Sequence, residues 1–319
     1  MGAFKRTRTA TAILAAAAAA TVALSGCSST TPQDETAAAT TRTIDSAFGE
    51  VTIPTEPQAA LGVYTTDVDV LITLGIPLAG AQPIRSEFDD FPYYLSDDAL
   101  EGVEPFANFP EVNYEAVAAA EPDFILNSLG YDEEVVKRLP DVAPTYSVNA
   151  FDGQDWRVHF KETATALDRL DKYEEWENIY EQRLDEVKAL VSDKAADLVV
   201  AVVYPEYGGP GIQTICGGQT LCSVYQDLGI KILPVSEQEG GVILSPEQFD
   251  QLNDANVALT VSDYGDMTTL TSSEAWKRLP FVQNGQILEY DLELSFGSPS
   301  SQLALLDEVE KDLVELLGL

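Results

Sequence analysis

The longest amphipathic pattern in the chain runs from Asp155 to Lys194, a stretch without glycine or proline that is rich in strong helix formers. Its apolar residues recur every three or four positions, which places them on one face of a helix. They are Phe160, Ala164, Leu167, Leu170, Trp176, Ile179, Tyr180, Leu184, Val187 and Val191. Charged residues between Asp168 and Lys172 interrupt this stripe and predict a break there. The remaining helix, about residues 171–193, would be roughly 35 Å long and is interpreted as a rigid strut between two lobes. A long helix packed inside one domain is the alternative.

The stretches before this helix alternate between strand and helix patterns. Residues 41–54 alternate apolar and polar positions around Phe48-Gly49-Glu50, which predicts a hairpin. Buried strands are predicted at 59–64, 76–82, 123–127 and 143–148, and helices at 68–75, 113–120 and 132–138. Residues 85–109 are rich in aromatic side chains and are predicted to be irregular, which is typical of functional or mobile segments.

After the long helix the same alternation begins again. Residues 197–204, DLVVAVVY, form a β-branched run that is typical of a strand buried on both faces. Further strands are predicted at 231–235, 257–263 and 286–291, and helices at 221–229, 245–254, 273–279 and 300–317. This order predicts an α/β fold with mainly parallel sheets. Its parts would be an N-terminal lobe at residues 43–154, a connecting helical region at 155–194 and a C-terminal lobe at 195–319.

The composition allows an ordinary apolar core but gives an unusual charge. Apolar residues make up 45% of the chain, while 18 basic residues face 53 acidic ones, for a net charge of −35. Such a surface repels nucleic acid and anionic lipid headgroups, so neither is an expected partner. The charge itself is explained either by a role related to a ligand or by solubility in a particular habitat.

The N-terminus has the three parts of an export signal. Lys5, Arg6 and Arg8 precede an apolar run at residues 13–24, which is too short and alanine-rich for a membrane span. Residues 1–26 are therefore predicted to be a signal peptide, whose removal would take the net charge to −38 because three positive charges are lost. The ending Leu24-Ser25-Gly26-Cys27 resembles the lipobox of bacterial lipoproteins, which implies a lipidated Cys27 and a chain anchored to the outer face of the cell membrane. Residues 27–42 would be a flexible, lipid-anchored tether.

Two further cysteines, Cys216 and Cys222, are separated by GGQTL. An exported compartment permits their oxidation, so a small loop disulfide is predicted. A metal site would need more ligands than two thiols, and no histidine is nearby in the sequence.

Five motifs, taken in order, resemble one family: the substrate-binding lipoproteins of ABC importers for iron-siderophores, haem and cobalamin. They are FGEVTIPTEP, LITLGIPLAGA, YEAVAAAEPDFIL, LSPEQFDQLNDANVALTV and EAWKRLPFVQNGQILEYD, and they extend over about Thr43–Leu317. The resemblance implies two lobes joined by one long helix, a ligand cleft between the lobes, and small lobe movements on binding. It implies a monomer that is not an enzyme and that delivers its ligand to a permease and its ATPase. It also implies that Glu115 and Glu247, one on each lobe, form salt bridges with arginines of the permease. For Glu247 the alternative is helix capping, and for Glu115 a solvated charge in a first helical turn.

The predicted ligand site follows from the strand ends, because parallel sheets bind ligands at the carboxyl ends of their strands. Tyrosine recurs there, and its flat ring and hydroxyl suit a bulky amphipathic chelate. Arg85 follows a predicted strand and is a scarce cation. The predicted ligand-binding residues are Tyr64, Arg85, Tyr131, Tyr204, Tyr207 and Tyr264. The alternatives are ordinary packing for any one tyrosine and a surface role for Arg85.

The scarcity of cations bears on the ligand. Arg85 is the clearest cleft cation, with Arg157 and Arg278 less certain, which favours a neutral or cationic ferric chelate of hydroxamate type over a strongly anionic one. The chelator would supply the ligands of the iron, so no cofactor and no protein metal site is predicted.

Other classes stay open as alternatives. Haem or cobalamin could be the ligand, and sensing could replace transport. A zinc or manganese receptor would need several histidines or carboxylates, and this chain has one histidine, His159. A secreted hydrolase is disfavoured because Gly-x-Ser-x-Gly is absent and His159 is the one imidazole for a triad.

Overall fold

The computed structural model describes residues 40–128, 133–150, 152–216, 220–238, 240–261 and 267–319. Within these residues the folded part of the chain forms one compact unit. The predicted signal peptide and most of the tether, including Cys27, lie outside the described residues, as do Tyr131 and Tyr264. Among the described helices, none is long and apolar enough to cross a membrane.

The folded part opens with the predicted hairpin. Strands β1 (Thr41–Ile44) and β2 (Val51–Pro54) pair antiparallel, with Thr41 opposite Pro54. Gly49 turns the chain between them with φ of 107°, a conformation that favours glycine. The hairpin prediction is confirmed.

Apart from this antiparallel hairpin, the N-terminal sheets are parallel, as predicted. One has the order β3-β6-β7 and the other pairs β4 with β5. Their strands are β3 (Ala60–Gly62), β4 (Ala81–Arg85), β5 (Glu104–Phe109), β6 (Phe124–Asn127) and β7 (Thr145–Ser147). The connections include α1 (Thr65–Thr73), α2 (Tyr114–Ala119), α3 (Glu133–Val136) and the 3₁₀ turn η1 (Leu139–Asp141).

Two predictions in this part were wrong. The strand expected at residues 76–82 begins only at Ala81, and Leu78 forms just an isolated bridge with Ala60. Pro77 has no backbone N–H to donate to a neighbouring strand, so regular strand pairing begins later in the chain. The segment 85–109, which was expected to be irregular, contains β5. The sequence did not indicate this strand because Pro105, a residue that disfavours strands, lies within it.

The C-terminal part contains a parallel sheet of order β11-β8-β13-β14 and an antiparallel sheet of order β12-β10-β9. Their strands are β8 (Val199–Val202), β9 (Tyr204–Pro205), β10 (Ile212–Thr214), β11 (Lys231–Ile232), β12 (Val242–Leu244), β13 (Val257–Val261) and β14 (Ile287–Tyr290). The helices are α6 (Thr220–Asp227), α7 (Thr268–Ser272), α8 (Pro280–Gln283) and α9 (Pro299–Leu317). Three 3₁₀ segments are η2 (Pro246–Leu252), η3 (Trp276–Arg278) and η4 (Leu292–Ser295).

Here too the sequence misjudged some elements. The helices expected at 245–254 and 273–279 are mainly the 3₁₀ segments η2 and η3. The β-branched run at 197–204 is not one strand: β8 ends at Val202, and Tyr204 starts β9 in the antiparallel sheet. The antiparallel sheet was not predicted, because its strands have only two or three residues.

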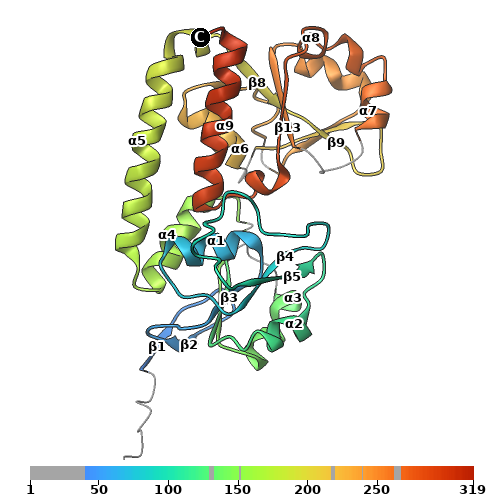
Figure 1. Cartoon of the computed structure of the whole chain (residues 1–319). Helices are drawn as coiled ribbons and strands as arrows, with labels where there is room; N and C mark the ends of the chain where they lie inside the picture. The colour runs from blue at the N-terminus through green and yellow to red at the C-terminus, as the bar shows by residue number, and fades with distance from the viewer. Residues whose placement is uncertain (1–39, 129–132, 151, 217–219, 239, 262–266) are drawn as a thin grey trace, which may run out of the picture. The chain divides into compact units, whose positions relative to one another are not determined.

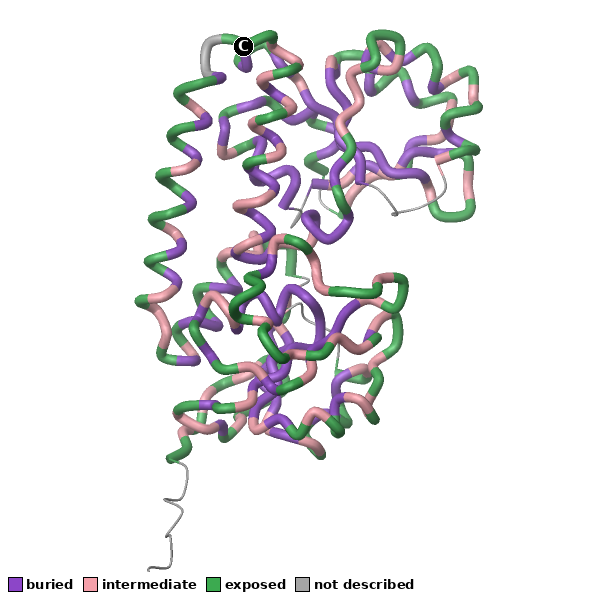
Figure 2. Tube along the Cα trace, viewed as in Figure 1, coloured by how far each residue is buried: buried purple, intermediate pink, exposed green. Residues whose placement is uncertain are grey.

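The predicted break in the connecting region is confirmed. Helix α4 (Trp156–Ala166) ends before Asp168, which has a φ of 56°, and α5 (Leu170–Ala195) begins two residues later. Helix α5 runs alongside α9 (Figure 1), and Trp176 Nε1 donates a 2.9 Å hydrogen bond to the Pro299 carbonyl. Buried and exposed residues alternate along α5 with the helical period (Figure 2). The long helix therefore packs along one face, although the exact lobe boundaries stay a prediction.

One apolar cluster connects these parts. It contains Phe124 of β6, Trp176 and Val187 of α5, Val200 of β8 and Leu305 of α9. Buried aromatic rings pack against one another at the start of the connecting region. The rings of Trp176 and Phe160 are arranged edge-to-face, with their centroids 5.4 Å apart. The connecting helices are thus part of the core and not a solvated linker.

Candidate ligand-binding site

Tyr64 lies where β3 turns into α1. The turn is fixed by Asp67, whose carboxylate accepts hydrogen bonds from the backbone N–H groups of Val63 and Tyr64 at 3.0 and 2.9 Å. Gly62 permits this close approach, because a Cβ there would lie 2.8 Å from the Asp67 Cβ. Tyr64 is only 2% exposed, and its hydroxyl donates a 2.9 Å hydrogen bond to Glu293. Burial raises the pKa of Tyr64 most, and the nearby charge of Glu293 raises it further, so the hydroxyl keeps its proton and remains a donor.

Arg85 is the last residue of β4 and not a residue beyond it. Its side chain is 11% exposed, and its guanidinium lies over the Phe109 ring, 4.7 Å from the centroid. The Nε atom donates to Glu87 at 2.6 Å, and Nη1 donates to the Tyr64 hydroxyl at 3.3 Å. The structure therefore brings Tyr64 and Arg85 together, the two predicted ligand residues at the ends of β3 and β4.

Glu293 completes this cluster from the far end of the chain. It lies in η4, is 3% exposed, and accepts hydrogen bonds at both oxygens, from Tyr64 at 2.9 Å and from Thr65 at 2.7 Å. Its Oε1 atom is 3.7 Å from Arg85 Nε. Burial raises the pKa of Glu293, and the hydrogen bonds from Thr65 and Tyr64 and the charge of Arg85 oppose that rise. The sequence did not indicate this residue, since an isolated glutamate in DLELS carries no distinctive signal.

A second buried carboxylate joins the same two parts of the chain. Asp69 of α1 is fully buried, and its Oδ2 atom accepts hydrogen bonds from the backbone N–H groups of Ser300 at 2.7 Å and Ser301 at 3.3 Å. These N–H groups belong to the first turn of α9, where no intrahelical partner exists. Burial raises the pKa of Asp69, and hydrogen bonds from Ser298 and Ser300 oppose the rise. Asp69 thus caps α9 from another helix.

The other predicted ligand residues occupy different environments. Tyr204 is 1% exposed in β9, whereas Tyr207 is fully exposed in the following turn. That turn is braced by Glu206, whose carboxylate accepts a 3.0 Å hydrogen bond from the Gly211 N–H. Tyr204 is thus as deeply buried as Tyr64, while the side chain of Tyr207 is open to solvent. The ligand roles of both stay predictions.

The two less certain cations have partners of their own. Arg157 donates to Asp227 at 2.6 Å and to Asp155 at 2.7 Å. Arg278 donates to the Glu274 carbonyl at 3.0 Å. Of the three arginines considered for the cleft, only Arg85 contacts Tyr64 among the described residues.

The sequence between Tyr64 and Leu294 matches the pattern of a known family, described as periplasmic binding protein. The match covers most of the described chain. The chain belongs to the periplasmic binding protein family. The matched stretch includes Tyr64, Arg85 and Glu293. Membership confirms the predicted resemblance and agrees with the prediction that the chain is a binding protein and not an enzyme.

Individual relatives of this periplasmic binding protein are distant but match over three quarters of the chain or more. "Probable siderophore-binding lipoprotein YfiY" of Bacillus subtilis is 26% identical over 321 residues, covering 90% of this chain and 93% of its own. The iron-uptake system-binding protein of the same organism is 25% identical over 247 residues, covering 75% of each chain. The crystal structure of a periplasmic solute binding protein from Mycobacterium smegmatis is 21% identical, has a TM-score of 0.70, and covers 87% of this chain and 99% of its own. This structural likeness confirms the α/β fold class.

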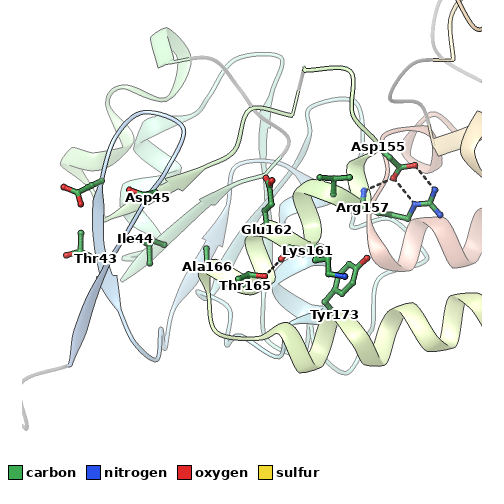
Figure 3. A pocket seen from close by; sticks show the side chains of 12 residues that line it. Thr43, Ile44, Asp45, Asp155, Arg157, Lys161, Glu162, Thr165, Ala166 and Tyr173 are labelled. Atoms are coloured by element: carbon green, nitrogen blue, oxygen red, sulfur yellow. Dashed lines mark hydrogen bonds and ion pairs between the residues drawn. The ribbon is translucent and has the colours of Figure 1, made fainter.

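A pocket of this periplasmic binding protein lies away from the Tyr64–Arg85–Glu293 cluster. It has a volume of about 860 Å³ and is lined by the hairpin, α4 and the start of α5 (Figure 3). Its two cations have partners, since Arg157 pairs with Asp155 and Lys161 Nζ lies 5.0 Å from the centre of the Tyr173 ring. Of the predicted ligand-binding tyrosines and Arg85, none that the structure describes lines it, although the less certain candidate Arg157 does. We therefore place the candidate site at the cluster, where strand ends converge, and not at this hollow.

The described residues contain no group of three or more His, Cys, Asp or Glu side chains arranged to hold a metal ion. The single histidine, His159, is 5% exposed, and its Nε2 atom lies 3.1 Å from Asp152.

Cys216 and Cys222 are joined by a disulfide, with Cα atoms 5.5 Å apart. The bond closes a small loop between Cys216 and Cys222, which lies in α6, so its stabilising effect should be modest and local. On exported, native protein we expect neither thiol to react with an alkylating reagent. The unreduced mass should be lower by the two hydrogen atoms that oxidation removes. Full labelling of both cysteines without reductant would disprove the bond.

Proposed function

We propose that this protein is the extracytoplasmic solute-binding component of an ABC importer, and that it captures a ferric siderophore. The observation that carries the proposal is the contact between Tyr64, just after β3, and Arg85, the last residue of β4, inside the family match. Relatives support the ligand class. The Staphylococcus aureus protein SirA is described as complexed with staphyloferrin B, and FhuD2 of the same organism with bound ferrioxamine B.

The proposed ligand is a preformed chelate with neutral or positive charge, such as a ferric hydroxamate. Arg85 can donate hydrogen bonds to chelate oxygens, and tyrosine rings can cover its apolar surface. Tyr207, with its ring exposed, is the proposed contact from the C-terminal lobe, and Tyr131, Tyr204 and Tyr264 complete the proposed set. The proposed ligand cleft lies between residues 43–154 and 195–319. The chelator supplies the ligands of the iron, and the protein contacts only the outer surface of the complex.

Delivery completes the proposed function. Glu115 lies in the first turn of α2 and Glu247 in the first turn of η2, and both are exposed. We propose that they pair with arginines of a permease, and that lipidated Cys27 holds the monomeric protein at the outer face of the membrane. Relatives named as lipoproteins support an extracytoplasmic location.

Tryptophan fluorescence of the purified protein, titrated with ferric trihydroxamates, ferric tricatecholates, haemin and cobalamin, tests the proposal. We expect saturable quenching by a ferric trihydroxamate. Saturation by haemin or cobalamin alone would assign the protein to another ligand class of the same family. Binding of none of the four would contradict the proposed function.

Replacement of Arg85 identifies the site within the same titration. Arg85→Ala should weaken binding by about 1.5–3 kcal/mol, the scale of a hydrogen bond to a charged group, or about tenfold or more. Tyr207→Ala should also weaken binding, through lost contact area. Arg278→Ala is a matched control on η3 and should leave affinity unchanged. If Arg278→Ala and Arg85→Ala behave alike, the cluster is not the ligand site.

A further inference from the structure

Two carboxylates surround the single guanidinium of the candidate site. Glu87 accepts a hydrogen bond from Arg85 Nε at 2.6 Å and also pairs with Nη2. Glu293 lies 3.7 Å from the same Nε atom. The group of three side chains therefore carries a net charge of about −1 when both carboxylates are ionised.

The two carboxylates differ in exposure. The Glu87 side chain is 44% exposed, so water screens it and a ligand atom can displace it from Arg85. The Glu293 side chain is 4% exposed and is held by two hydroxyl donors. Because charges interact more strongly where water is excluded, Glu293 compensates Arg85 more effectively than its distance alone would suggest.

Hydrogen bonding alone does not require a carboxylate at position 293. The partners are the hydroxyls of Tyr64 and Thr65, and a hydroxyl either donates or accepts. A glutamine would therefore satisfy the same two groups. What a glutamine would lack is the negative charge beside Arg85.

We propose that Glu293, assisted by Glu87, sets the charge preference of the ligand site by compensating Arg85, so that the site accepts uncharged chelate oxygens and rejects anionic complexes. This inference rests on the proposed function, because it assigns a role within the same site. It also distinguishes chelate classes. A ferric ion bound by three singly charged hydroxamates is neutral, whereas three doubly charged catecholates leave the complex with three negative charges.

The test compares the full-length protein with the variants Glu293→Gln and Glu87→Gln. The probes are a neutral ferric trihydroxamate and a ferric tricatecholate, each titrated at low and at physiological salt. Glu181→Gln is the matched control, because it removes the same charge from an exposed position on α5. We expect Glu293→Gln to raise the affinity for the tricatecholate about tenfold relative to the trihydroxamate, with a gain that shrinks as salt rises. Glu87→Gln should give a smaller shift of the same sign, and Glu181→Gln none.

The outcomes separate this inference from the proposed function. If the wild-type protein binds the trihydroxamate but neither site variant changes the ratio, the charge role is wrong and the proposed function stands. If all variants including Glu181→Gln shift equally, global charge is responsible and the inference fails. If no form of the protein binds either chelate, both the inference and the proposed function fail. If Glu293→Gln does not fold, the test rests on Glu87→Gln, which changes an exposed residue. An unchanged ratio of tricatecholate to trihydroxamate affinity in that variant would then overturn the proposal.

Discussion

Replacing both Glu115 and Glu247 with arginine should abolish uptake of the ferric siderophore by cells. Both side chains are exposed, and among the described residues neither contacts Tyr64 or Arg85. In the proposed docking each glutamate meets an arginine of the permease, so the substitutions would place like charges opposite one another. Affinity of the purified variant should stay within about twofold of wild type, because exposed charges remote from a site have small effects on its binding.

Uptake and affinity must be measured on the same variant for this prediction to be decisive. The matched control is the pair Glu174→Arg and Glu181→Arg on α5, which changes the charge equally at two exposed positions. That control should transport normally. A collapse of affinity in the Glu115→Arg, Glu247→Arg variant would place these carboxylates in the fold or the ligand site instead. Normal uptake by the Glu115→Arg, Glu247→Arg variant would show that these two glutamates take no part in docking.

Asp69→Ala should lower the free energy of unfolding by about 2–4 kcal/mol, since it removes the acceptor of two N–H groups in the first turn of a helix and opens a cavity where the buried carboxylate lay. The groups concerned are the backbone N–H groups of Ser300 and Ser301 at the start of α9. Because Asp69 belongs to α1, the substitution also removes a bond between the N-terminal part and the last helix. Denaturant unfolding monitored by circular dichroism measures the change.

The control for this prediction is Asp185→Ala, at an exposed position of α5, which should change the unfolding free energy by less than about 0.5 kcal/mol. Equal destabilisation by the two substitutions would mean that the buried cap contributes nothing specific. A much smaller effect of Asp69→Ala would mean that water replaces the lost carboxylate.

The fold was largely predictable where a pattern is long or chemically strong. The stripe from Phe160 to Val191 predicted the connecting helices, and the charges at Asp168–Lys172 located their break, where Asp168 adopts a left-handed conformation. Runs of β-branched residues such as VVAV predicted parallel strands, because both faces of such strands are buried.

Short elements were not predictable in the same way. Strands β9, β10 and β12 have two or three residues each, too few for a period to be recognised. The 3₁₀ segment η2 begins with the signals of an α-helix, a capping serine followed by proline, but its hydrogen bonds span three residues and not four. Local sequence cannot separate these alternatives, since packing against neighbours decides between them.

The site was predictable one residue at a time but not as a cluster. Strand ends pointed to Tyr64 and Arg85, and the structure joins them. Glu293 lies 229 residues from Tyr64 in the chain, so only the fold reveals their contact. Tyr204 and Tyr207 looked equivalent in sequence, yet one is buried and the other fully exposed, because Tyr204 lies in β9 and Tyr207 in the turn that follows this strand.

In the proposed function the protein binds a preformed ferric chelate and leaves it unchanged. Calorimetric titration with a ferric trihydroxamate, followed by mass analysis of the ligand released on denaturation, tests it most directly. We predict saturable binding of one intact chelate per protein, and no saturable binding of ferric ion supplied from a weak carrier such as nitrilotriacetate. Tight stoichiometric binding of bare iron, or recovery of a chemically altered chelator, would contradict the account.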